Sequence, residues 1–121
     1  MTPQTILIAD DDRSIRTVLD QALGRIGHNV RATDNASTLW HWIEAGEGDL
    51  VITDVVMPQM DGATLIQRVR EIHPDFKVIL ISGYAEESFR ERLAATKSVT
   101  FLPKPFSLNQ LAGTVKAVTE A

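Results

Sequence analysis

Cysteine is absent from this sequence of 121 residues, and its absence excludes three classes of site. A disulfide framework, a thiolate zinc site and cysteine catalysis all require a residue that the chain does not have. Long apolar runs are also missing, because none approaches the roughly 18 residues that cross a membrane. Met1 to Gln4 contains neither the basic region nor the apolar segment of a signal peptide. We therefore expect a cytoplasmic protein with no membrane segment.

Basic charge is scarce, since 12 Lys and Arg residues stand against 16 Asp and Glu residues and the net charge is −4 at pH 7. Nucleic-acid-binding domains are usually basic, so we expect no direct contact with nucleic acid. An apolar fraction of 44% is enough for a buried core. The length suits one domain, and no repeat or Gly/Ser linker divides it. Residues 1–121 are therefore predicted to form a single domain.

Two kinds of apolar pattern alternate five times along the chain. Short apolar runs, typical of strands buried on both faces, lie at 5–9, 50–53, 77–81 and 99–102. A weaker strand, with Val30 and Ala32 on one face, is predicted at 28–33. Apolar residues at helical spacing predict helices around 15–26, 39–43, 65–72 and 107–118, and a polar helix with few apolar anchors is predicted at 85–96. Five strand–helix units in succession predict an α/β protein with a parallel sheet covered on both faces.

Chain topology then limits where a site can lie. Right-handed crossovers leave few arrangements, and the usual one is the flavodoxin-like (βα)5 doubly wound parallel sheet with strand order 2-1-3-4-5. Ligands of such sheets bind beyond the carboxyl ends of the strands, at the point where the strand order reverses. In this chain that point lies between the first and third strands.

Polar side chains stand at the carboxyl ends of four predicted strands: Asp10 and Asp11, Asp54, Ser82, and Lys104. Three carboxylates at one sheet edge repel one another unless a cation holds them together. Oxygen ligands alone favour a hard ion such as Mg²⁺. A carboxylate there can attack phosphorus, while Mg²⁺ and a lysine neutralise the transferred group.

Each of these residues also has a plainer interpretation. An aspartate after a strand often caps the next helix, and for Asp12 capping and a role in the site remain equally open. Lys104 stands between two prolines, as solvated loop lysines do, and Ser82 before Gly83 is typical of a turn. Their joint occurrence at four strand ends favours a site.

Five segments carry a resemblance to one family: Ile6 to Asp12, Asp49 to Pro58, Met60 to Gly62, Ile79 to Gly83 and Phe101 to Phe106. The five segments are spread along the chain, so the sequence resembles the receiver domains of two-component response regulators over essentially its whole length. The resemblance implies that Asp54 is the phosphoacceptor for a histidine kinase phosphohistidine. It further implies that Mg²⁺ is bound by Asp11, Asp54 and the Val56 carbonyl, with Asp10 a ligand through water.

The same resemblance implies a switch. Ser82 would meet the phosphoryl oxygens through its hydroxyl, and Lys104 would pair with the phosphoryl group. Phe101 stands where the family carries an aromatic switch residue, and the face around 85–120 would transmit the change. The Lys104–Pro105 bond resembles one that the family holds in the cis form.

Partners also follow from the resemblance. They are a histidine kinase or histidine phosphotransfer protein, an output domain or partner protein outside this chain, and a second copy in a homodimer. Asp34 to Pro58 is similar to receivers of nitrogen-regulation activators, whereas Met60 to Pro105 is similar to receivers of cell-cycle hybrid kinases. The two similarities predict a natural mosaic or an engineered chimera.

The switch is not expected to be an enzyme beyond self-phosphorylation and dephosphorylation. Two other functions compete with it. A Mg²⁺-dependent aspartyl-phosphate phosphatase of another α/β family would use the same Asp, Lys and Mg²⁺. Such enzymes commonly place a second Asp two residues after the nucleophile, where this chain has Val56. Flavin binding is disfavoured, because Asp10, Asp11 and Asp12 would repel an FMN phosphate.

Overall fold

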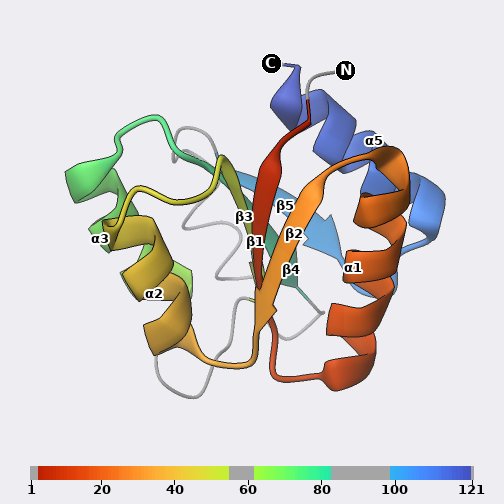
Figure 1. Cartoon of the computed structure of the whole chain (residues 1–121), viewed down its shortest axis with the longest axis horizontal. Coiled ribbons are helices and arrows are strands. Elements are labelled where there is room, and N and C mark those ends of the chain that lie inside the picture. The colour runs from red at the N-terminus through yellow and green to blue at the C-terminus, as the bar shows by residue number, and fades with distance from the viewer. Residues whose placement is uncertain (1–2, 55–61, 83–98, 121) are drawn as a thin grey trace.

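A computed structural model describes residues 3–54, 62–82 and 99–120 (Figure 1). Its strands are β1 (Thr5–Ala9), β2 (Asn29–Thr33), β3 (Leu50–Asp54), β4 (Lys77–Ser82) and β5 (Val99–Pro103). Its helices are α1 (Arg13–Ile26), α2 (Ala36–Glu44), α3 (Gly62–Ile72) and α5 (Leu108–Thr119). The helix predicted at 85–96 lies outside the described residues. No helix in the described part is both long and apolar enough to cross a membrane.

The strands form one parallel sheet in the order β2-β1-β3-β4-β5, which confirms the predicted flavodoxin-like fold. Helices α1 and α5 lie on one face of the sheet, and α2 and α3 lie on the other (Figure 1). Strands β1 and β3 are direct neighbours, with Ala9 opposite Thr53. The residues that follow these two strands therefore emerge side by side.

Each face of the sheet buries its own apolar cluster. The cluster toward α1 and α5 includes Ile6, Ile8, Leu19, Leu23, Leu111 and Val115. The cluster toward α2 and α3 includes Leu7, Leu39, Val51, Leu65 and Val69. Successive strand residues point to opposite faces, so one continuous apolar run contributes to both clusters. This packing fixes the strand ends on which the polar residues stand.

Local capping explains where the helices on one face begin and end. Helix α1 ends at Gly27, whose φ of 109° lies in the left-handed region that glycine adopts without strain. Ser107 and Gln110 form a capping box at the start of α5, each side chain accepting a hydrogen bond from the other residue's backbone N–H. The start of α5 near Ser107 is thereby confirmed.

Three details differ from the sequence-based expectation. Strand β2 begins at Asn29 and not at His28, whose buried ring accepts a hydrogen bond at Nδ1 from the backbone N–H of Gln4 (3.0 Å). Ile72 and Leu108, expected on apolar helix faces, are 45% and 54% exposed. They are the last residue of α3 and the first of α5, where a helix end has fewer neighbours to cover it.

Candidate functional site

Three carboxylates meet at the carboxyl edge of the sheet, as the strand ends predict. Asp10 directly follows β1 and Asp54 ends β3, so the pairing of Ala9 with Thr53 brings them together. Carboxylate oxygens of Asp10, Asp11 and Asp54 all lie within 4.8 Å of one another. Asp10 is fully buried and Asp54 is 9% exposed, whereas Asp11 faces solvent. Two of the three carboxylates are therefore largely shielded from water, and the third faces it.

Asp10 is the most constrained of the three carboxylates. Its Oδ1 accepts a hydrogen bond from the backbone N–H of Asp12 (2.8 Å), while its buried Oδ2 has no hydrogen-bond partner in the described part of the chain. Burial raises the pKa of Asp10 most, and the charges of Asp54 and Asp11 raise it further. The N–H of Asp12 and the charge of Lys104 act in the opposite direction.

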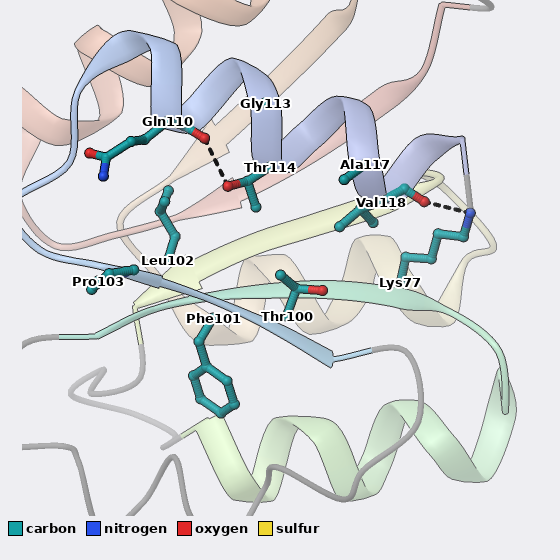
Figure 2. Close-up of a pocket in the computed structure, with 10 residues that line it drawn as sticks. All are labelled: Lys77, Thr100, Phe101, Leu102, Pro103, Gln110, Gly113, Thr114, Ala117 and Val118. Carbon is teal, nitrogen blue, oxygen red and sulfur yellow. Dashed lines mark hydrogen bonds between the residues drawn. The ribbon is translucent and has the colours of Figure 1, made fainter.

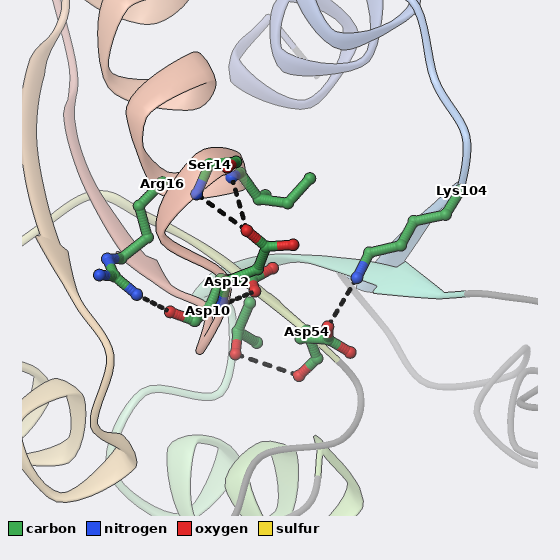
Figure 3. A network of polar contacts seen from close by, with 8 residues as sticks. Asp10, Asp12, Ser14, Arg16, Asp54 and Lys104 are labelled. Atoms are coloured by element: carbon green, nitrogen blue, oxygen red, sulfur yellow. Dashed lines mark hydrogen bonds and ion pairs between the residues drawn. The ribbon is translucent and has the colours of Figure 1, made fainter.

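Asp12 caps α1. Its side chain accepts hydrogen bonds from the backbone N–H groups of Ser14 (2.8 Å) and Ile15 (3.4 Å) (Figure 3). Among the described residues the carboxylate cluster contains Asp10, Asp11 and Asp54, but not Asp12. The structure thus confirms that Asp12 caps α1, and a role in the site stays a prediction.

Lys104 reaches the cluster from the loop after β5. Its Nζ donates a hydrogen bond to Asp54 Oδ2 at 2.8 Å (Figure 3). Burial alone lowers the pKa of Lys104, but the hydrogen bond and charge of Asp54, together with Asp10 and Asp11, raise it overall. The Lys104–Pro105 bond is cis, as expected. An ammonium group therefore balances part of the charge of the three carboxylates.

The structure describes the remaining predicted residues, Ser82, Val56 and Phe101, to different extents. Ser82 is the last residue of β4, beside β3 at the same sheet edge, and its side chain lies outside the described part. Val56 lies outside the described residues. Phe101 is half-buried on β5 and packs against the cluster of Ile66, Val78 and Leu80.

Two contacts at the site involve residues to which the sequence reasoning gave no role. The Thr53 hydroxyl donates to the Asp54 carbonyl (3.2 Å). Arg16 Nη1 donates to the Asp10 carbonyl (2.7 Å), as Figure 3 shows. Arg16 stands in the first turns of the helix that follows Asp10, and no pattern in the sequence indicates its backbone partner.

This donor set fits a hard divalent cation. Asp10 Oδ2 is a buried acceptor with no hydrogen-bond partner among the described residues, and Asp11 and Asp54 each place a carboxylate oxygen within 4.8 Å of one from Asp10. Carboxylate oxygens are the ligands that Mg²⁺ prefers, and the cation would relieve the repulsion among them.

Comparison with known proteins identifies the family. Residues 6–116 match the model of the response regulator receiver domain. The chain belongs to this family, the receiver domains of two-component systems, and the resemblance found in the sequence is confirmed.

Two curated relatives and one solved structure illustrate the similarity. The DNA-binding transcriptional regulator NtrC of Azospirillum brasilense is 51% identical over 116 residues, which cover 96% of this chain and 24% of that protein. The sensor kinase CckA of Brucella abortus is 44% identical over 118 residues, which cover 96% of this chain and 12% of that protein. The receiver domain of NtrX from Brucella abortus superposes with a TM-score of 0.87 at 25% identity, covering 96% of this chain and 98% of that one.

The chain thus spans about a quarter of the length of NtrC and less of CckA. Both alignments run over nearly the whole chain, so each relative resembles both halves. A mosaic of two receiver groups stays a prediction.

Proposed function

We propose that this receiver domain is a phosphoacceptor switch in which Asp54 takes a phosphoryl group from the phosphohistidine of a histidine kinase or histidine phosphotransfer protein. One observation carries the proposal: Lys104 Nζ lies 2.8 Å from Asp54 Oδ2, at the place where three carboxylates meet. A nucleophile for phosphorus and a cation for the transferred charge are therefore in direct contact. In this proposal residues 1–121 act as a single domain.

The transfer step uses the Asp54 carboxylate. One of its oxygens attacks phosphorus and forms an O–P bond, which makes an acyl phosphate. The P–N bond to the donor imidazole breaks, and its electron pair returns to the imidazole nitrogen. Burial of Asp54 at the end of β3 supports this role, because the strand and the Thr53 hydroxyl hold its backbone in place.

Charge neutralisation comes from two sources. Asp10, Asp11 and Asp54, with the carbonyl of Val56, would hold Mg²⁺, Asp10 acting through a water molecule. When bound, Mg²⁺ supplies positive charge to the oxygens of the transferring phosphoryl group. The Lys104 ammonium, which donates to Asp54 Oδ2, would supply a second positive charge.

The response is proposed to spread from Asp54 toward β5. A phosphoryl group adds a charge of roughly −1.5 to −2 and three acceptor oxygens. The Ser82 hydroxyl would donate to one of these oxygens, and Phe101 would turn into the space released. A groove of about 540 Å³ between β5 and α5 lies within the face that is proposed to transmit the change (Figure 2).

Partners follow from the proposed switch. The phosphodonor and the domain must share a compartment, which we place in the cytoplasm. An output domain or partner protein would read the face around 85–120, and a second copy of the chain is one such partner. The domain itself is proposed to be a stoichiometric acceptor, not a turnover enzyme.

Phosphorylation by acetyl phosphate and Mg²⁺, followed by intact mass, tests the proposal. The parent should gain one phosphoryl group, and Asp54→Asn should gain none. Asp20→Asn, which changes an exposed aspartate of α1, should be labelled like the parent. Labelling of Asp54→Asn at the parental rate would contradict the assignment. Repeated turnover of a phosphomonoester would instead support the phosphatase alternative.

A further inference from the structure

We infer that Arg16 is a positioning residue for the cation site, because it holds the peptide unit between Asp10 and Asp11 in the orientation that cation binding requires. The inference rests on the proposed Mg²⁺ site and adds a residue that is not one of its ligands. It concerns a hydrogen bond to the protein backbone and not a contact with the cation.

The contact itself is direct. Arg16 Nη1 donates to the Asp10 carbonyl at 2.7 Å, and Figure 3 shows the side chain reaching from α1 to the end of β1. The backbone N–H of Arg16 also donates to the Asp12 carbonyl (3.1 Å). Arg16 is thus hydrogen-bonded through its backbone and its side chain to the same Asp10–Asp12 segment.

The Asp10 carbonyl belongs to the planar peptide unit that joins Asp10 to Asp11. Fixing its oxygen fixes the plane of that unit, and with it the direction in which Asp11 leaves the strand. Asp11 is exposed, so little side-chain packing holds it in place. Backbone orientation is therefore the main restraint on where its carboxylate lies.

Asp10 is held by contacts from three different directions. Its N–H donates to the Thr33 carbonyl of β2 (3.1 Å), its carbonyl accepts from Arg16, and its Oδ1 accepts from the Asp12 N–H. Only Oδ2 is left without a partner among the described residues, and Asp10 contributes a carboxylate oxygen to the cluster with Asp11 and Asp54. The contacts around Asp10 thus leave one oxygen to face the cation.

Loss of Arg16 has two effects of opposite sign, and this makes the inference testable. Through space, removal of a positive charge near the carboxylates would tighten Mg²⁺ binding. Through the lost hydrogen bond, a freer Asp10–Asp11 peptide would weaken it. We expect weaker binding, because Arg16 is partly exposed and its through-space effect is screened by salt. Partners of metal ligands typically change affinity by about 10- to 100-fold.

Calorimetric titration with Mg²⁺ near physiological ionic strength tests this. Arg16→Met, which keeps much of the side-chain stem without a donor, should raise the Kd about tenfold, at the low end of effects for partners of metal ligands. Arg16→Lys, which restores a donor, should bind close to the parental affinity. Arg13→Met is the matched control, since it removes the same charge from an exposed position one turn earlier. Its Kd should be unchanged or slightly lower.

Phosphorylation by acetyl phosphate gives a second readout. With Arg16→Met the Mg²⁺ concentration for half-maximal rate should rise, while the rate at saturating Mg²⁺ stays near the parental value. Equal or tighter Mg²⁺ binding by a folded Arg16→Met would overturn the inference, as would failure of Arg16→Lys to restore affinity. Absence of Mg²⁺ binding in the parent would instead overturn the proposed cation site itself.

Discussion

The two sides of the site are built differently. At the junction of β1 and α1, Asp10 is fully buried and hydrogen-bonded to Thr33, Arg16 and Asp12. At the junction of β5 and α5, the Lys104 side chain is 35% exposed, and Asp54 is its one hydrogen-bond partner in the described part of the chain. The acidic side is therefore fixed before any ligand arrives, whereas the basic side can move with it. We infer that the acidic side binds the cation and that the basic side responds to phosphorylation.

Replacement of Lys104, on the basic side, should change the phosphorylation rate more than any other substitution proposed below. Lys104→Ala removes the charge that faces Asp54, so the rate of phosphorylation by acetyl phosphate at saturating Mg²⁺ should fall about 100-fold, as for other donors to a developing charge. Lys116→Ala, which changes an exposed lysine of α5, is the control and should react at the parental rate. A parental rate in Lys104→Ala would remove the basic side from the proposed mechanism.

Amide chemical shifts compare the two sides directly. Phosphorylation should change the signals of residues 82–106 far more than those of 13–33, because the half-buried Phe101 can repack more easily than the braced β1–α1 junction. Ser82→Ala should still be phosphorylated, with a smaller response in 82–106. Similar changes on both sides would show that the difference in packing does not set where the response occurs.

Neutralising Asp10 should alter stability in a pH-dependent way. Burial raises the pKa of Asp10 in the folded protein, so folding favours the protonated carboxyl group. The stability that Asp10 contributes is fully present below the unfolded-state pKa and is lost as pH rises through the folded-state pKa, because the buried group then ionises. In the presence of EDTA at pH 7, Asp10→Asn should therefore unfold at a higher denaturant concentration than the parent. The gain should shrink as pH falls through the raised folded-state pKa toward the unfolded-state value of about 4, below which little of it remains. A gain that is constant with pH would contradict this origin.

The smallest effect is expected at Asp12. Asp12→Ala should lower the free energy of unfolding by about 1 kcal/mol, because the cap of α1 is lost, whereas Asp12→Asn should keep it within a few tenths. Both variants should be phosphorylated, since Asp10 accepts from the backbone N–H of residue 12 and not from its side chain. Loss of phosphorylation in Asp12→Asn would mean that the carboxylate has a role beyond capping.

Much of the fold and the meeting of the carboxylates were predictable from sequence. Continuous apolar runs such as 50–53 indicate strands buried on both faces, and parallel strands bring their carboxyl ends to one edge. Asp10 and Asp54 therefore had to lie close once the strand order was assigned. Their distance along the chain did not matter.

Other features depend on geometry that no sequence pattern reports. Capping and ligation both favour an aspartate at position 12, so only the hydrogen bonds to Ser14 and Ile15 separate them. Arg16 acts on a backbone carbonyl six residues earlier, and such a contact leaves no periodic signal. Leu108 matches the apolar spacing of α5 yet is exposed, because spacing does not reveal where a helix end loses its neighbours.

The ion pair between Lys104 and Asp54 joins residues 50 positions apart, and this separation has a consequence for protein synthesis. A growing chain folds from its N-terminal part onward. Every nascent chain therefore passes through a stage that contains Asp10, Asp11 and Asp54 but not yet Lys104. At that stage the carboxylates lack the ammonium group that partly offsets their repulsion. A chain interrupted before Lys104 keeps the acceptor aspartate without its positive partner, so the site is complete only once the loop after β5 has been synthesised.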